Sequence, residues 1–203
     1  MGGSVDLMRR TFPDEVDDAL ARYPVGREAS AVLSLLYLAQ AAYGYLTDEA
    51  IAEVASTVGL PPTHVRGLAG FYTLLYERPT GGYVIHFCTD LPCALRGAEP
   101  MLDRLCAKLG IEPGETTADG LFTVEAVMCL AACDRAPMMQ VNLEYYEDLT
   151  DERLDEIIAD LRERASSSAL RRPPLGFGPP SEMALDSPAE ARGIDGHRQG
   201  DDA

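Results

Sequence analysis

The sequence has no apolar run long enough to cross a membrane. Its longest apolar stretch, residues 29–43, is interrupted by Ser34 and Gln40 and falls short of the roughly 20 residues that a spanning helix needs. The N-terminal MGGSVD lacks the basic, apolar and small-residue segments of a secretory signal. We therefore expect an intracellular protein without direct membrane insertion.

Basic residues are also scarce. The chain has 17 Lys and Arg against 33 Asp and Glu, which gives a formal net charge of −16. Nucleic acids and anionic lipids are polyanions that recruit Lys and Arg, so this balance disfavours both as partners. We expect partners that are proteins or small redox species, and no nucleic acid.

Residues 1–80 are predicted to form an N-terminal helical bundle. Thr47 suits an N-cap and Gly59 a C-terminal stop, while Pro13 suits a first helical turn. The stretch of residues 28–43 is apolar nearly all round, which indicates a buried central helix. The four stretches with helical spacing are 13–22, 28–43, 47–59 and one that opens at residues 61 and 62.

Residues 81–164 change period and are predicted to form an α/β domain. Residues 83–87, LFTVEAV and MMQVN have the pattern of strands. Residues 94–109 have the spacing of one helix with Leu95 on its inward face, and Thr150 caps a last helix. The order strand, helix, strand, strand, helix predicts a sheet covered by helices, so the fold class is expected to be α+β.

Residues 165–203 are rich in Ser, Pro, Gly, Arg and Asp and have no apolar period. Such a segment buries too little apolar surface to offset the entropy of ordering it. We expect a disordered tail, with docking of LRRPPLGFGPP on a partner as the alternative.

Four of the five cysteines stand in two local pairs. CTDLPC places Cys88 at the end of a strand and Cys93 at or just before a helix, and MCLAACDRAP places Cys129 and Cys133 between two strands. Cys106 stands alone on the inward face of a helix, where a cysteine is a small apolar residue. Two thiol pairs on neighbouring loops are typical of a metal site.

The spacing disfavours other uses of these pairs. A thioredoxin-type redox pair has two residues between its cysteines, and neither pair has that gap. Disulfides belong to oxidising compartments, which the intracellular expectation opposes. Zinc and a 2Fe-2S cluster both accept four cysteines, and the wide gaps favour the cluster without excluding zinc.

The stretch VIHFCTDLPCALRGAE, followed by CLAACDRAP and by QVN with YYEDLT, resembles the thioredoxin-like 2Fe-2S ferredoxin subunit of NADH:quinone oxidoreductase, respiratory complex I. GYLTDEAIAEVASTVGLPPTHVRGLAGFYTLL resembles the helical region of that family, and the likeness covers about residues 26–164. The resemblance implies that one 2Fe-2S cluster is held by Cys88, Cys93, Cys129 and Cys133.

The resemblance also implies how the chain works. Its helical region would dock on a flavin- and NADH-binding subunit in the hydrophilic arm of the complex, and its cluster would exchange single electrons with the FMN of that partner. The chain has no P-loop and no G-x-G-x-x-G after a strand, which agrees with FMN and NADH binding on the partner. The chain would be cytoplasmic, peripheral on the inner face of the membrane, and without a complete active site of its own.

Two further functions remain open at this point. The equivalent subunit of a soluble NAD-linked hydrogenase or formate dehydrogenase would carry the same motifs. A zinc-stabilised interaction or DNA-binding protein is the alternative of another class, because DEAIAEVASTVGLPPTHVRGLAGFY resembles a helix-turn-helix. Its second helix offers only His64 and Arg66 as early polar contacts and the chain is acidic, so a packing unit is favoured.

Two departures from the family bear on the cysteine loops. The family commonly has Gly where this chain has Ala131 and Asp134, and a positive φ at either position would cost on the order of 1 kcal/mol or more. The bond between Ala136 and Pro137 is predicted to be cis, as thioredoxin-like folds commonly have a cis-proline at this point.

Four charged residues near the cysteines are expected to tune the cluster. Asp90 and Asp134 lie within or beside the ligand loops, and Arg96 and Arg135 follow a few residues away. Anions disfavour reduction of a negatively charged cluster and cations favour it.

Overall fold

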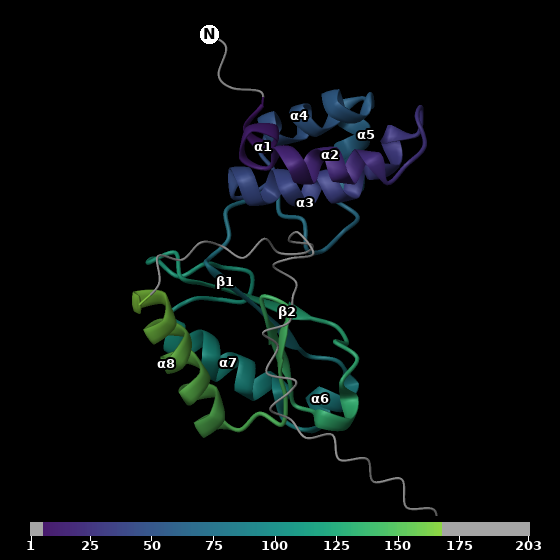
Figure 1. Cartoon of the computed structure of the whole chain (residues 1–203). Helices are drawn as coiled ribbons and strands as arrows, with labels where there is room; N and C mark the ends of the chain where they lie inside the picture. The colour runs from purple at the N-terminus through teal and green to yellow at the C-terminus, as the bar shows by residue number, and fades with distance from the viewer. Residues whose placement is uncertain (1–5, 168–203) are drawn as a thin grey trace, which may run out of the picture.

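The structure is a computed structural model, and it describes residues 6–167. Two lobes lie one above the other in Figure 1, joined by the chain between residues 70 and 82. One lobe is helical, and the other contains a sheet with helices. The predicted α+β class is confirmed.

Caps at both ends define the helix over Asp48–Val58 in the first lobe. The Thr47 hydroxyl accepts a hydrogen bond from the backbone N–H of Ala50 at 3.1 Å, and Gly59 ends the same helix at φ 68°. The predicted helix from Pro13 is present, and a short helix precedes it. The elements are α1 Leu7–Thr11, α2 Pro13–Ala21, η1 Glu28–Ala31, α3 Val32–Tyr43, α4 Asp48–Val58 and α5 Pro62–Ala69.

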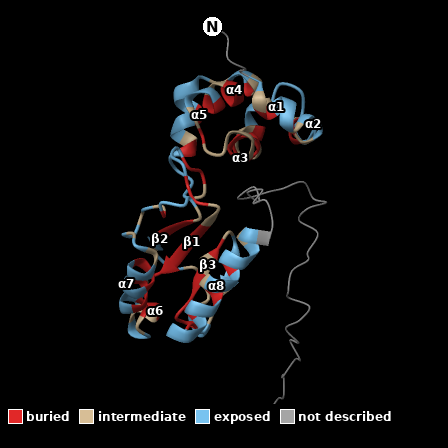
Figure 2. Cartoon of the chain, turned by 90° about the vertical axis from the view of Figure 1, so that its left-hand side faces the viewer, coloured by how far each residue is buried: buried red, intermediate tan, exposed pale blue. Residues whose placement is uncertain are grey.

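The helix α3 is the centre of this lobe, as its continuous apolar sequence predicts. Leu35, Leu36 and Ala39 have no exposed surface, and residues of the other helices in this lobe pack around them. A separate hydrophobic core lies in the second lobe. Figure 2 shows these two buried regions as distinct red patches.

The second lobe is built on a four-stranded sheet in the order β2-β1-β3-β4. β1 pairs with β2 in parallel, and the other two pairings are antiparallel. The elements of this lobe are β1 Tyr83–Cys88, α6 Leu91–Leu95, α7 Ala98–Leu109, β2 Phe122–Val127, η2 Cys133–Arg135, β3 Met139–Val141, β4 Glu144–Tyr146 and α8 Asp151–Ser167.

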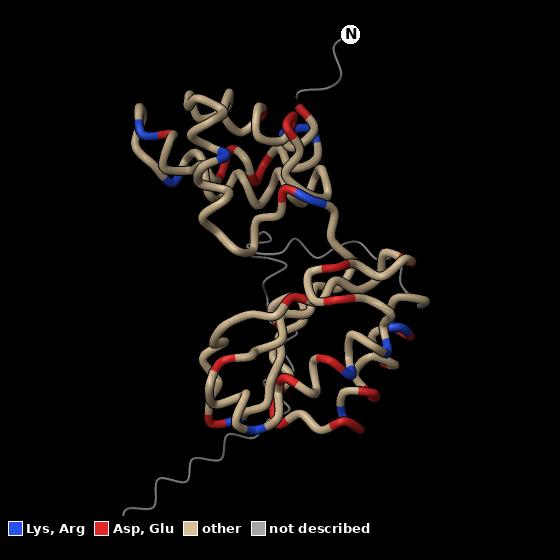
Figure 3. Tube along the Cα trace, turned by 180° about the vertical axis from the view of Figure 1, so that it is seen from behind, with Lys and Arg blue, Asp and Glu red and all other residues tan. Residues whose placement is uncertain are grey.

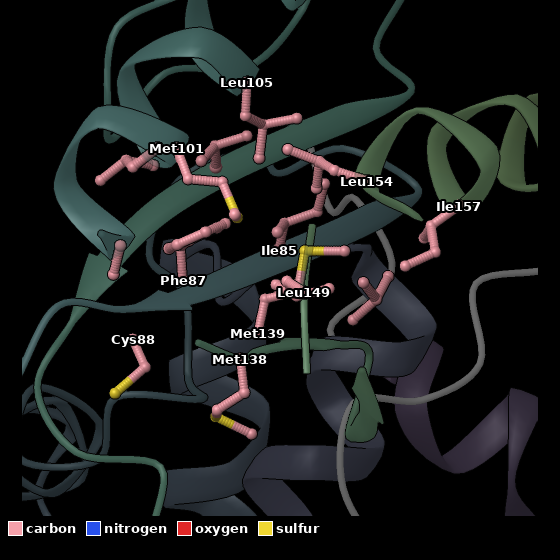
Figure 4. Close-up of a cluster of buried hydrophobic side chains, with 14 of the residues drawn as sticks. Ile85, Phe87, Cys88, Met101, Leu105, Met138, Met139, Leu149, Leu154 and Ile157 are labelled. Carbon is pink, nitrogen blue, oxygen red and sulfur yellow. The ribbon is translucent and has the colours of Figure 1, made fainter. Parts of the chain in front are cut away.

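Alternation along β1 divides the sheet into two faces. Ile85 and Phe87 are completely buried and share a core with Leu105 of α7 and Leu154 of α8. Figure 4 shows these side chains pointing into the space between the strands and the two helices. Helices α7 and α8 therefore cover the same face of the sheet.

The helix predicted over residues 94–109 is in fact two helices. Gly97 has φ 88°, a left-handed conformation that interrupts the helical hydrogen bonding, so α6 and α7 meet at an angle. Leu95, which we expected on the inward face, is 78% exposed as a result. The prediction for Leu95 was wrong because the spacing continues through a residue at which the backbone turns.

The strand β4 was not expected. Asn142 and Leu143 both have positive φ, of 46° and 75°, and they connect β3 to β4 as a tight hairpin. Leu is an unusual residue in such a turn, so the sequence has no clear hairpin signal here. The segment YYEDLT therefore begins as a strand before it leads into α8.

The connection between the lobes is held from both sides. Gln40 of α3 donates to the carbonyl of Leu74 at 2.9 Å and accepts from the N–H of Tyr76 at 2.7 Å. The hydroxyl of Tyr76 lies 3.0 Å from Nε2 of His86 on β1, and burial raises the pKa of this tyrosine. Tyr76 thus joins the central helix of one lobe to the strand that ends at Cys88.

Helix α8 extends to Ser167, three residues past the boundary expected at residue 164. The rest of the expected tail, including LRRPPLGFGPP, lies outside the described residues. Among the helices between residues 6 and 167, none has the length and apolarity to cross a membrane.

Candidate metal centre

The parallel pairing of β1 and β2 brings the two cysteine loops together. Cys88 ends β1, and its partner in the register is Val127, the last residue of β2. Because the carboxyl ends of parallel strands meet at one edge, the loops that follow them are neighbours. Thr89 connects them directly, since its N–H and its hydroxyl both donate to the carbonyl of Val127, at 2.9 and 3.0 Å.

Cys88 and Cys93 form the inner pair. They are 2% and 1% exposed, Cys88 at the end of β1 and Cys93 within α6. Burial, followed by a hydrogen bond with the Cys88 thiol, raises the pKa of Cys93 to about 11, while the backbone N–H of Met138 acts in the opposite direction. Figure 4 places Cys88 beside Met138 at the edge of the core.

Cys129 and Cys133 form the outer pair, and both are exposed. Their sulfur atoms are 3.5 Å apart, and the N–H of Ala131 donates to Sγ of Cys129 at 3.3 Å. The pKa of Cys133 is raised first by its hydrogen bond with Cys129, and also by some loss of solvation and by the charges of Cys129, Cys88 and Asp90. Both pairs lie in loops that leave the sheet at the edge where β1 and β2 end.

The donor set fits a two-iron cluster. The thiols stand as two pairs, of which Cys88 and Cys93 are buried and Cys129 and Cys133 are exposed. In a 2Fe-2S cluster with four cysteines each iron takes two thiolates, whereas a structural zinc takes four ligands about one centre. An inner and an outer pair match the first arrangement.

The loop that carries Cys129 and Cys133, here called the outer loop, is held in place by contacts with β4 and with the segment between β4 and α8. The hydroxyl of Tyr145 donates to the carbonyl of Leu130 at 2.8 Å. The side chains of Arg135 and Asp148 form an ion pair at 2.5 Å, and the N–H of Asp148 donates back to the carbonyl of Arg135 at 2.8 Å. Neither Tyr145 nor Asp148 stood out in the sequence as a support of this loop, because each belongs to the unexpected hairpin or follows it.

The loop also contains the two backbone features that the sequence suggested. The Ala136-Pro137 bond is cis, which confirms that prediction. Ala131 has φ 65°, so the strain considered for this position is present, whereas Asp134 lies in η2 and is not among the residues with positive φ.

The remaining charged residues near the cysteines have structural contacts. The Asp90 carboxylate caps α6 by accepting from the N–H of Leu91 at 2.9 Å, and Nε of Arg96 donates to the carbonyl of Ala136 at 3.3 Å. Cys106 is a residue of the hydrophobic core of the second lobe, where its side chain is 4% exposed. Burial raises the pKa of its thiol. It is not part of either pair.

Comparison with known proteins agrees with this arrangement. The family described as thioredoxin-like 2Fe-2S ferredoxin matches residues 16–162. The chain is 43% identical to NADH-quinone oxidoreductase subunit 2 of Thermus thermophilus over 150 residues, which are 73% of this chain and 83% of that protein. It is 41% identical to a NADH-quinone oxidoreductase subunit of Rhizobium meliloti over 159 residues, which are 77% of this chain and 94% of that protein.

A solved structure is also similar. The NAD+-reducing NiFe-hydrogenase in the air-oxidised state superimposes with a TM-score of 0.58 and 29% identity. The superposition covers 64% of this chain and only 23% of the hydrogenase chain. The similarity is therefore to one part of a longer polypeptide.

Proposed function

The chain belongs to the thioredoxin-like 2Fe-2S ferredoxin family, and from that premise we propose that it is the electron-transfer subunit of an NADH:quinone oxidoreductase. Its ligands in this proposal are Cys88, Cys93, Cys129 and Cys133. The observation that supports it is that the two cysteine-bearing loops leave the sheet side by side at one edge, in a chain whose relatives are subunits of that enzyme.

Each pair has a distinct part in holding the cluster. Cys88 and Cys93, beside the hydrophobic core, would hold one iron, and the exposed Cys129 and Cys133 would hold the other. When bound, a 2Fe-2S cluster supplies a carrier of one electron at a time. The chain supplies four thiolates and excludes water from the inner pair.

Backbone N–H groups adjust the charge on the sulfurs. The N–H of Ala131 donates to Cys129, and that of Met138 interacts with Cys93. Such donors stabilise negative charge on thiolate sulfur, so they would favour the reduced state of a cluster held there and raise its potential. The N–H of Ala131 thus acts on the outer pair, and the N–H of Met138 acts on the inner pair.

The partners follow from this role. We infer a flavin- and NADH-binding subunit as the redox partner and further hydrophilic subunits as neighbours, with FMN and NADH bound outside this chain. Attachment to such a complex would place the chain peripherally on the inner face of the membrane. Relatives named as subunits of NADH-quinone oxidoreductase support this assembly.

The two lobes would have different functions, one in docking and one in binding the cluster. Separate hydrophobic cores lie within residues 8–75 and 85–161, and we propose that the helical unit of residues 1–80 contributes to docking while the unit of residues 81–164 holds the cluster. The contacts of Tyr76 with both units would keep them in a defined orientation.

The test is reduction by NADH through the partner. The full chain, purified without oxygen, is mixed with the FMN-containing subunit of its native complex, and electron paramagnetic resonance is recorded after NADH addition. We expect a rhombic signal with the partner present and none with the chain and NADH alone. An unreduced cluster in the presence of an active, NADH-oxidising partner would contradict the proposal.

A soluble NAD-linked hydrogenase is the second candidate, because the similar solved structure is a hydrogenase. A formate dehydrogenase would use an equivalent subunit. The subunits that co-purify with the chain distinguish the three: membrane subunits of a quinone reductase, a nickel-containing subunit or a formate-oxidising subunit. We expect the first.

A further inference from the structure

A single peptide group in the outer loop connects Tyr145 to Cys129. The hydroxyl of Tyr145 donates to the carbonyl oxygen of Leu130 at 2.8 Å. The N–H of the same peptide group belongs to Ala131, and it donates to Sγ of Cys129 at 3.3 Å. Hydroxyl, peptide and sulfur therefore form one chain of hydrogen bonds that ends on a proposed ligand.

The sheet topology explains why a residue of β4 reaches this peptide. The strands lie in the order β2-β1-β3-β4, so the outer loop, which connects β2 to β3, passes the end of β1. Tyr145 is the middle residue of β4 and stands opposite Gln140 of β3 in the register. The hairpin thus fixes Tyr145 beside the strand into which the outer loop runs.

The Tyr145 hydroxyl holds the peptide in an orientation that strains the backbone. Ala131 has φ 65°, which is unfavourable for alanine. If the peptide between Leu130 and Ala131 turned over, this φ would become negative, in a region that alanine adopts without strain. The turned peptide would point its N–H away from Cys129 and its carbonyl away from Tyr145. The hydrogen bond from Tyr145 therefore opposes a rotation that the strain favours.

The same hydroxyl also polarises the peptide. A hydrogen bond to the carbonyl oxygen draws electron density away from the N–H, and successive bonds in such a chain strengthen one another by roughly 10–30% each. A stronger N–H donor stabilises negative charge on the sulfur that accepts it. Both effects of Tyr145, orientation and polarisation, therefore act on Cys129 in the same direction.

The charges around the outer loop oppose reduction of a cluster, so a donor of this kind has something to offset. Acidic positions are more frequent than basic ones in Figure 3, as in the whole sequence. Glu144 and Asp134 are exposed next to Tyr145 and Cys133. The side chain of Arg135 forms an ion pair with Asp148. Nearby anions disfavour a more negative cluster, whereas N–H donors to sulfur favour it.

We propose that Tyr145 is a positioning residue of the cluster: its hydroxyl orients and polarises the peptide between Leu130 and Ala131 and thereby raises the reduction potential. This inference rests on the proposed function, of which it needs the cluster and its four ligands but no partner subunit. Tyr145 acts through the peptide, and its contribution is the hydroxyl group rather than the aromatic ring.

The test compares Tyr145→Phe with Tyr146→Phe in the full chain, purified without oxygen and with its cluster bound. Tyr146 is the matched control, because it is the next residue of β4 and its hydroxyl is hydrogen-bonded to Glu144. The midpoint potential is measured by titration with dithionite, followed by electron paramagnetic resonance. We expect the equilibrium constant of one-electron reduction to fall about threefold in Tyr145→Phe, a shift of about 28 mV, and to stay unchanged in Tyr146→Phe.

A second variant strengthens the hydrogen bond instead of removing it. With 3-fluorotyrosine at position 145, introduced by nonsense suppression, the side chain differs from tyrosine by one small atom and its hydroxyl is a stronger donor. In mildly acidic solution we expect this chain to have a higher midpoint potential than the original chain. If Tyr145→Phe does not hold a cluster, the 3-fluorotyrosine chain decides alone.

The outcomes separate this inference from the proposed function, because the titration contains no partner subunit. Equal potentials in the original chain and in Tyr145→Phe, equal losses in both phenylalanine variants, or no rise with 3-fluorotyrosine would overturn the role of Tyr145 and leave the proposed function standing. The expected shifts together with a failure of NADH to reduce the cluster through the partner would refute the proposed function alone. A chain without a reducible cluster would overturn both.

Discussion

The backbone N–H of Ala131 points at Sγ of Cys129, 3.3 Å away, from a residue whose φ is 65°. A left-handed conformation is unfavourable for alanine because its Cβ crowds the backbone. The surrounding contacts, including the hydrogen bond from Tyr145 to Leu130, keep the loop in this form. Strain at Ala131 is therefore linked to a hydrogen bond that reaches the sulfur of Cys129, one of the proposed ligands.

Ala131→Gly should stabilise the chain. The left-handed conformation costs a residue other than glycine roughly 1–2 kcal/mol, and Ala131→Gly removes this cost. Glycine also has a larger conformational entropy in the unfolded state, which lowers the stability of the folded chain by roughly 0.5–1 kcal/mol. We expect a net gain of about 0.5–1 kcal/mol in the free energy of unfolding, measured by urea unfolding of the reduced, metal-free chain.

Ala132→Gly is the matched control, because Ala132 has φ −114° and gains nothing from glycine. It should lower the free energy of unfolding or leave it unchanged. Equal losses in both variants would show that Ala131 is not strained.

Replacing single cysteines should distinguish those that bind the cluster from the one that only packs in the core. Cys129→Ala removes one thiolate of the outer pair, so we expect the visible absorption and the electron paramagnetic resonance signal to be lost or strongly altered. Cys106→Ala removes a buried sulfur of the core and should leave both spectra intact while it lowers stability by about 1 kcal/mol. A chain that loses its spectrum on Cys106→Ala while still folded would refute the ligand assignment.

The buried carboxylate of Glu53 anchors the N-terminal helix. It accepts hydrogen bonds from the N–H groups of Met8 and Arg9 at 3.0 and 2.9 Å and from the hydroxyl of Tyr43 at 2.8 Å. Glu53→Gln replaces one accepting oxygen with a donor, so we expect a loss of about 2 kcal/mol in the free energy of unfolding. Amide exchange of Met8 and Arg9 should accelerate.

The exposed neighbour Glu49 provides the control for this effect. Glu49→Gln lies on the same helix and removes the same charge, but it breaks no buried hydrogen bond, and we expect a change of less than about 0.5 kcal/mol. Similar effects of the two substitutions would mean that Glu53 does not anchor α1.

Stability should fall in alkaline solution. Burial and the hydrogen bond to Glu53 raise the pKa of Tyr43 to about 12, and burial is the main cause that raises that of Tyr146 to about 12. An unfolded tyrosine ionises near a pKa of about 10, so between these values the folded state retains protons that the unfolded state has lost. This contribution is complete below pH 10 and declines toward pH 12.

Urea unfolding at several pH values between 9 and 11.5 measures this decline. Tyr43→Phe removes one of the tyrosines whose pKa is raised, so its stability should fall less steeply with pH than that of the original chain. Parallel curves would exclude Tyr43 as a source of the alkaline sensitivity.

Much of the fold was predictable because its signals are local. Thr47 and Thr150 cap helices where the sequence indicates, and each accepts the expected N–H. The cysteine pairs were also placed correctly on the chain, Cys88 at the end of a strand and Cys129 with Cys133 between strands. Parallel pairing of the first two strands then brings the pairs together.

Other features depend on backbone geometry that residue spacing does not reveal. The turn at Gly97 places Leu95 in solvent although its spacing matches the buried residues of α7. The hairpin through Asn142 and Leu143 creates β4 without a standard turn sequence. The support of the outer loop by Tyr145 follows from that hairpin, so it could not be foreseen either.

Metal and sulfide analysis of the chain tests the central claim most directly. The full chain is purified without oxygen, its iron, zinc and acid-labile sulfide are quantified, and its electron paramagnetic resonance is recorded after reduction with dithionite. The account predicts a brown protein with about two irons and two sulfides per chain and a rhombic signal on reduction. A colourless protein with one bound zinc and no such signal would contradict it.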